Sequence, residues 1–324
     1  MYKKLILYLI IALSLIVILD RVIFKLVYIP ETQDTYTSFP AIQLLDRPVP
    51  SNIWAIGASH IGFGLDTDEF EKSSGLTLLN AQAPGRSYES NVYFTYELLG
   101  KIRKPKLILL DVAWMAFQVN PEIKVHAVDF QHISLKNKLR YLIFHFPSSL
   151  KYLSKLYSYR YNTVFYKSKE KAIKEAIADK KFDIYTERGF VRSSRVMDTD
   201  VLRKSLDRFD REYNKGKYTE DKAKIDACIK IIEIARKEDI PVVIIELPEY
   251  YKLKEKQQRE LYDKRLEIIR KKYNVEYLNF NISDNPITRE MKYFRDADHL
   301  NGVGAREWTR EFCKTLRKKG IIKE

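Results

Sequence analysis

A serine and a histidine–aspartate pair, far apart in the sequence, are the residues of this chain best suited to chemistry. Ser59 lies in the block Gly57-Ala-Ser-His60, directly after a short apolar run. Asp296 and His299 are three residues apart near the other end of the chain. This spacing lets the carboxylate meet one imidazole nitrogen and leaves the other free to take a proton from a serine. The three residues therefore indicate a nucleophilic serine activated by histidine.

Plainer interpretations exist for the same residues. A serine after glycine often only completes a turn, Asp298 is suited to capping a helix, and His299 could be an ordinary surface residue. A metal site is a further alternative, but its spacing matches no standard ligand pattern, so we predict no metal. Its ligands would be Asp296, Asp298, His299 and His60.

Strands and helices alternate around these residues. Apolar runs predict strands at 52–56, 76–81, 106–112, 240–247 and 275–280. Helical patterns occur at 88–99, 222–237, 255–272 and 308–318, and a further helix is expected only after residues 66–68. Apolar strands that alternate with helices predict a parallel sheet covered on both faces. Gly57 permits the tight turn that would hold Ser59 at the carboxyl edge of this sheet, where open α/β folds bind ligands.

The length of 324 residues, 45% of them hydrophobic, suits one α/β domain with an insertion. The alternation of strands and helices is lost between about residues 120 and 218, where Lys, Tyr and Phe are frequent. We predict a mainly helical cap there, with a helix near 168–179. Cys228 and Cys313 lie among apolar residues in helical patterns and are expected as buried free thiols.

The N-terminus indicates a membrane anchor. Two lysines precede an apolar run at 5–19, which alone is shorter than the roughly 30 Å hydrocarbon core of a bilayer. Continuation to residue 28, with Arg21 and Lys25 reaching the far interface, gives a helix that can span it. No small-residue cleavage site follows, so we predict an uncleaved anchor with an inside N-terminus. A buried amphipathic helix of a soluble domain is the alternative.

These features predict three segments: a membrane anchor at 1–28, an extended proline-containing stalk at 29–50 and an extracytoplasmic domain at 51–324. The protein would be a single-pass protein of a bacterial-type cell envelope, bound to the lipid bilayer through residues 5–28. The net charge of +14 suits nucleic acid, anionic lipid or an acidic polymer and does not choose between them. The positive residues are widely spread and no RRM-like or zinc-finger-like motif occurs, so we expect no nucleic-acid partner.

Three blocks resemble the SGNH/GDSL hydrolase family. The block at Ser59 is similar to the family's Gly-Asp-Ser block, and the eight residues from Asn80, which include Gly85, resemble its glycine block. Asp296-x-x-His299 matches the Asp-x-x-His block. The blocks occur in the family's order and cover about 52–112 and 219–318 together with the expected strands.

The resemblance implies a three-layer flavodoxin-like fold and no cofactor. It also implies Ser59 as nucleophile, with Asp296 and His299 as its partners. The backbone amides of Ser59 and Gly85 would form the oxyanion hole, where loss of one donor typically costs about 100- to 1,000-fold in rate.

The chain departs from the family at the third strand. The family places Gly-x-Asn-Asp there, but this chain has no asparagine between Leu110 and Trp114. Asp111 cannot donate to an oxyanion unless protonated, and a carboxylate nearby would oppose the developing charge. His60 or a residue of the insertion would have to substitute, or activity would be low or lost.

The expected function is that of a membrane-anchored esterase or O-acyltransferase with an acyl-serine intermediate. The chain resembles proteins of polysaccharide O-acetylation and teichoic acid D-alanylation, which implies a carbohydrate polymer substrate and an integral-membrane acyltransferase as partner. Arg86 and Arg295 flank two of these blocks, where an arginine could orient an anionic acceptor, but an arginine beside a turn is usually solvated, so we assign neither a role. The aromatic residues at 152–166 would stack on sugar rings or form the core of the cap. The alternative is a catalytically inactive scaffold or glycan-binding protein. A third hypothesis, a membrane-tethered binder of anionic lipid or nucleic acid, is supported by the net charge alone.

Overall fold

The centre of the molecule is a five-stranded parallel sheet. The computed structural model describes residues 2–27, 44–82, 88–118, 127–144, 147–154, 183–213, 216–282 and 285–323. The strand order is β2-β1-β3-β6-β7, and each neighbouring pair is parallel. The strands are β1 (Ile53–Gly57), β2 (Leu78–Gln82), β3 (Leu107–Asp111), β6 (Val242–Glu246) and β7 (Glu276–Asn279). This order is consistent with the flavodoxin-like fold, and the α/β fold with a parallel sheet is confirmed.

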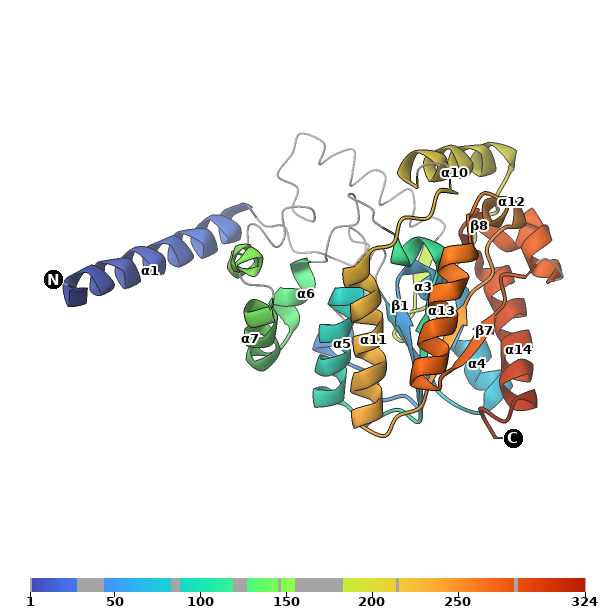
Figure 1. Cartoon of the computed structure of the whole chain (residues 1–324), viewed down its shortest axis with the longest axis horizontal. Helices are drawn as coiled ribbons and strands as arrows, with labels where there is room; N and C mark the ends of the chain where they lie inside the picture. The colour runs from blue at the N-terminus through green and yellow to red at the C-terminus, as the bar shows by residue number, and fades with distance from the viewer. Residues whose placement is uncertain are drawn as a thin grey trace.

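Helices cover both faces of the sheet, as the apolar strands require. Every residue of β1, β2, β3 and β6 is buried, so each strand needs a partner layer on both sides. Figure 1 shows α5 and α11 on one side of the sheet, with α13 beside α11, and α4 and α14 on the other. The helices are α4 (Thr67–Ser74), α5 (Tyr88–Lys101), α11 (Lys222–Lys237), α13 (Glu260–Tyr273) and α14 (Gly302–Lys318).

The predicted elements are present, with shifted ends in several cases. The helix expected at 222–237 has these bounds in the structure. The helix expected at 255–272 is α13, which begins at Glu260 and is preceded by the short helix α12 (Tyr251–Lys254). The last helix begins at Gly302, six residues before the predicted start, because Asn301 caps it. Gly304 then lies so close to the chain at Tyr293 that a Cβ would be 2.1 Å from the Tyr293 carbonyl oxygen.

The described part of the insertion is helical but also contains a β-hairpin that the sequence did not predict. Its elements are α6 (Ala127–His132), α7 (Leu135–Phe144), the 3-10 helix η2 (Ser148–Leu153), β4 (Asp183–Tyr185), β5 (Val191–Ser193) and α10 (Thr199–Glu212). Both views place α10 near β8 (Phe294–Asp296), as a cap requires. The helix predicted near 168–179 and the aromatic residues Tyr157 to Tyr166 lie outside the described residues.

Two findings near the N-terminus differ from expectation. Residues 44–46 are helical, and Leu44 and Leu45 are buried in the core, so this end of the predicted stalk is packed and not extended. Helix α1 (Tyr2–Val27) forms as predicted, but none of the helices among the described residues is long and apolar enough to cross a membrane. The transmembrane helix predicted within residues 5–28 is therefore not supported. Cys228 and Cys313 are buried free thiols, as expected.

Replacement of Asn301 by alanine should destabilise the fold. Its side-chain oxygen accepts hydrogen bonds from the amides of Val303 and Gly304, and its amide group donates to the carbonyls of Lys292 and Phe294. We expect Asn301→Ala to lower the free energy of unfolding by about 2 kcal/mol, because a helix cap and buried hydrogen bonds are lost together. Urea unfolding of the two proteins measures this difference.

Asn274→Gly is the matched control. Asn274 ends α13 in the left-handed conformation (φ 43°), which glycine adopts without steric cost. Its effect should stay below about 0.5 kcal/mol. Equal losses in the two variants would contradict the structural role given to Asn301.

Candidate active site

Ser59 is presented by a sharp junction between strand and helix. Strand β1 ends at Gly57, and Ser59 is the first residue of the short helix α3 (Ser59–Gly64). A Cβ on Gly57 would lie 2.8 Å from both Asp111 Cβ and Ile61 Cγ1, so the helix can approach the sheet this closely only at glycine. The sequence predicted the next helix only after residues 66–68. Because α3 begins at Ser59 itself, the Ser59 amide belongs to a first helical turn, whose amides have no intrahelical acceptor.

Asn80 of β2 holds the far end of α3. Its buried side-chain amide donates to the carbonyl oxygens of Ile61 (3.2 Å) and Leu65 (2.7 Å). The Ile61 carbonyl also accepts the Leu65 amide at 3.2 Å, and Asn80 adds a hydrogen bond to each of the two carbonyls from the neighbouring strand. Sequence reasoning assigned Asn80 only to the block that contains Gly85 and did not identify this support.

The three predicted catalytic residues come together. His299, in β9 (His299–Leu300), places Nε2 2.7 Å from Ser59 Oγ and Nδ1 2.8 Å from Asp296 Oδ1. With a proton on Nδ1 donated to Asp296, Nε2 can accept the hydroxyl proton of Ser59. These contacts match the relay that the spacing of Asp296 and His299 predicted.

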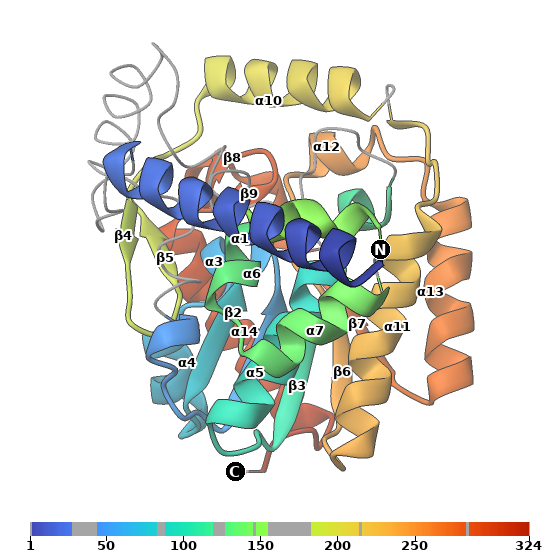
Figure 2. The same ribbon diagram turned by 90° about the vertical axis from the view of Figure 1, so that its left-hand side faces the viewer.

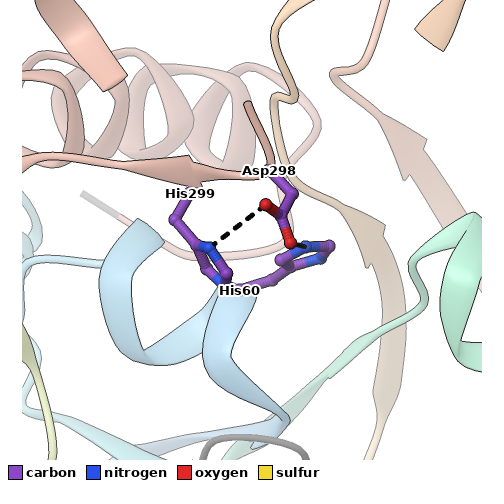
Figure 3. A group of neighbouring side chains, drawn as sticks. All are labelled: His60, Asp298 and His299. Atoms are coloured by element: carbon purple, nitrogen blue, oxygen red, sulfur yellow. Dashed lines mark ion pairs between the residues drawn. The ribbon is translucent and has the colours of Figure 1, made fainter. Parts of the chain in front are cut away.

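A second carboxylate faces the same imidazole. Asp298 Oδ1 lies 3.5 Å from His299 Nδ1, and Asp298 Oδ2 lies 3.9 Å from His60 Nε2. Figure 3 shows the carboxylate of Asp298 beside the two rings. Arg208 of α10 donates to both oxygens of Asp298, at 3.0 and 3.3 Å. Asp298 thus forms an ion pair with Arg208 of the insertion. The sequence suggested Asp298 as a helix cap, but the cap of the last helix is Asn301.

The geometry favours a catalytic triad over a metal site. His60, Asp298 and His299 offer ligand atoms within 4.8 Å of one another. His299, however, uses Nδ1 for Asp296 and Nε2 for Ser59, so a metal would have to displace one of them. The guanidinium of Arg208 on Asp298 would also repel a cation.

The carboxylates control the ionisation of the two histidines. Burial favours the neutral form of His299, but the charges of Asp296 and Asp298 and their hydrogen bonds outweigh it and raise its pKa to about 10. For His60, burial followed by repulsion from His299 lowers the pKa to about 4. Burial also opposes ionisation of Asp298, yet the cationic partners His299 and Arg208 hold the pKa of Asp298 well below its usual value. His60 is therefore neutral, whereas His299 favours the protonated state at neutral pH.

Asp111 does not carry the opposing charge that the sequence suggested. Its side chain is buried at the end of β3 beside Gly57, and Tyr88 donates its hydroxyl to the Asp111 carbonyl at 2.7 Å. Burial, then the nearby carboxylates Glu246 and Glu249, raise the pKa of Asp111 well above its usual value. We therefore expect an uncharged carboxylic acid at this position near neutral pH.

Arg295 supports the triad and is not free to orient an acceptor. It donates to Asp183 of β4 at 2.7 Å and lies 3.4 Å from Asp296. The arginine thereby links the carboxylate of Asp296 to the insertion. Sequence reasoning missed Asp183 and Arg208, because no local motif marks a partner about a hundred residues away. The predicted oxyanion residue Gly85 and the neighbouring Arg86 lie outside the described residues.

Comparisons with known proteins assign no family to this chain. No family model matches the sequence, and a search of the curated proteins finds no match. The functional assignment therefore depends on the geometry around Ser59.

The reactivity of Ser59 should rise with pH. Only neutral His299 can accept the serine proton, and the pKa of His299 is raised to about 10, so the base form grows as pH increases toward that value. Asp298→Asn removes one of the charges that stabilise the imidazolium. We expect the rise to move to lower pH and reactivity at pH 7 to increase. The rate of Ser59 modification by a fluorophosphonate, followed by mass spectrometry, gives both profiles.

Asp296→Asn is the matched control for this experiment. It also removes a negative charge from His299, but it takes away the acceptor that orients Nδ1. The maximal rate should fall by about 1,000- to 10,000-fold, whereas Asp298→Asn should keep most of it. A profile that Asp298→Asn leaves unshifted would contradict the electrostatic role of this carboxylate.

Proposed function

We propose that this protein is a serine esterase or O-acyltransferase. The observation that carries the proposal is the pair of contacts of His299, 2.7 Å to Ser59 and 2.8 Å to Asp296. A hydroxyl, an imidazole and a carboxylate in this order activate serine for acyl transfer on several unrelated folds. Their place at the carboxyl edge of a parallel sheet, where such folds bind ligands, supports the same conclusion.

The reaction proceeds in two halves. Ser59 Oγ attacks the carbonyl carbon of an ester while its proton passes to His299 Nε2. The tetrahedral intermediate collapses, the bond to the leaving oxygen breaks, and His299 returns the proton to that oxygen. Water or a hydroxyl of an acceptor then attacks acyl-Ser59, again with His299 as base. Water gives the free acid, and an acceptor hydroxyl gives a new ester.

The surroundings of Ser59 suit the charge that develops in each half. The Ser59 amide, in the first turn of α3, would donate to the oxyanion. An uncharged Asp111 adds no repulsion. Asp296 stabilises the imidazolium, and Arg295, held by Asp183, keeps Asp296 in place.

The substrate class proposed is a cell-surface polysaccharide or glycopolymer. Its support is the resemblance to polysaccharide O-acetylation and teichoic acid D-alanylation proteins, together with a net charge of +14 that suits an acidic polymer. An integral-membrane acyltransferase as acyl donor is part of the same proposal. The extracytoplasmic location and the single-pass anchor stay predictions from the sequence.

Ester turnover by the full-length chain in detergent tests the chemistry. Wild type should hydrolyse p-nitrophenyl acetate and form an acetyl adduct on Ser59 that mass spectrometry detects. Ser59→Ala should form no adduct, and its turnover should be at least about 1,000-fold lower, because no other group replaces the nucleophile.

His132→Ala is the matched control for His299→Ala. His132 pairs with Asp46 at 3.2 Å on the surface. It is therefore a histidine paired with an aspartate, as His299 is, but outside the candidate site. His299→Ala should abolish turnover with little change in melting temperature, and His132→Ala should leave turnover intact. A folded wild-type protein with neither turnover nor adduct would contradict hydrolysis of small esters. An inactive scaffold or glycan-binding protein would then be favoured, with a transferase that acts only beside its membrane partner as the other outcome.

A further inference from the structure

Helix α7 presents an apolar stripe to solvent. Leu135, Leu139 and Ile143 are spaced by four residues and therefore lie on one face of the helix. Their exposed fractions are 72%, 50% and 73%, and Leu150 and Leu153 of η2 are 49% and 44% exposed. These five residues form what we term the α7–η2 apolar surface. Exposed apolar residues gathered on neighbouring elements mark an interaction surface, whereas scattered ones do not.

The opposite face of α7 is fixed to the sheet domain. The ring of Tyr141 packs on Tyr93 of α5, with ring centroids 4.8 Å apart. Asn137 is buried and donates to Glu97 of α5 at 2.7 Å. The stripe is therefore the outer face of a helix whose inner face is already packed.

The surface lies at the base of α1. Arg21 donates to the Leu153 carbonyl at 3.3 Å, and Ser154 donates to Asp20 at 2.5 Å. Figure 1 shows α1 projecting from one side of the sheet domain, and Figure 2, viewed from that side, shows α1 and α7 both in front. Apolar side chains of α1 are exposed on every side of the helix, namely Leu7, Tyr8, Ile11, Leu15, Ile16, Val17, Ile18, Leu19 and Val22. This part of α1 therefore presents further apolar side chains near the α7–η2 apolar surface.

The charges beside the stripe identify its partner. Helix α7 contains Lys136, Lys138 and Arg140 and no acidic residue. Lys136 and Lys151 are exposed next to the apolar side chains. An apolar face flanked by cations is the pattern of helices that lie in the interface of an anionic bilayer. An anionic bilayer offers an apolar layer next to phosphate groups, so it complements the apolar side chains and the exposed cations together.

We propose that the α7–η2 apolar surface lies in the interfacial region of a lipid bilayer that contains anionic phospholipid, next to α1. The apolar side chains enter the boundary between headgroups and acyl chains, and Lys136 and Lys151 lie among the headgroup phosphates. Because the other face of α7 is packed on α5, this contact would fix the orientation of the whole sheet domain on the membrane. The inference does not depend on the chemistry proposed for Ser59.

A fluorescent probe at position 139 tests the contact. The native Cys228 and Cys313 are fully buried, so the full-length variant Leu139→Cys can be labelled selectively with an NBD dye. It is reconstituted into vesicles of equal parts phosphatidylcholine and phosphatidylglycerol. We expect a blue-shifted emission and strong quenching by lipids that carry a nitroxide near the headgroup. Both effects should weaken in vesicles of phosphatidylcholine alone, because the headgroup attraction is lost.

Leu261→Cys is the matched control. Leu261 is a leucine of α13 with an exposed fraction of 62%, and its probe should remain in water, with several-fold less quenching than at position 139. Equal, weak quenching at the two positions would overturn the proposal even if α1 holds the protein on the vesicles. Protection at position 139 that persists without lipid and disappears on dilution would overturn it in favour of a second copy of the chain.

Discussion

The contact between His299 and Ser59 joins two parts of the chain that are 240 residues apart, and most of the surrounding structure maintains it. One partner lies on α3, which Asn80 holds at its far end from β2. The other lies on the β8–β9 hairpin, which Asn301 fastens to the start of α14. Two buried asparagines thus support the two elements that carry the hydroxyl and the imidazole. A shift of either support would lengthen a contact that transfers a proton only at hydrogen-bond distance.

Buried charge is the second constraint at this edge of the sheet. Carboxylates gather there, and each needs a cation or a proton because desolvation penalises an isolated charge. Asp298 has Arg208, and Glu246 has a bidentate pair with Arg259 at 2.7 and 2.8 Å, whereas Asp111 favours the protonated form. The charges of Asp296 and Asp298 both act on His299 and raise its pKa. The same compensation makes the insertion part of the site, since Arg208 and Asp183 both belong to it.

The inserted helices connect the site region to the outer face of the molecule. Helix α10 contributes Arg208 to the hairpin that carries His299, and α7 is fixed to α5 through Asn137 and Tyr141. Because α5 also packs on the sheet, a membrane contact at the α7–η2 apolar surface would hold the carboxyl edge of the sheet at a defined orientation. Such an arrangement would suit an enzyme whose polymer substrate and acyl donor are both presented at a surface.

The sequence alone determined the five strands of the sheet and most of the helices that cover it, because apolar runs and helical periodicity report which segments are buried. It did not predict α3, the short helix that presents Ser59. It also indicated Ser59, Asp296 and His299 as candidate site residues, since a serine after a strand and a carboxylate three residues from a histidine are local patterns. Only the tertiary structure decided the partners Arg208 and Asp183, which approach the site from distant segments. It also decided the ionisation of Asp111 and His299. Burial and the distances between charges set those pKa values, and neither exists until the chain is folded.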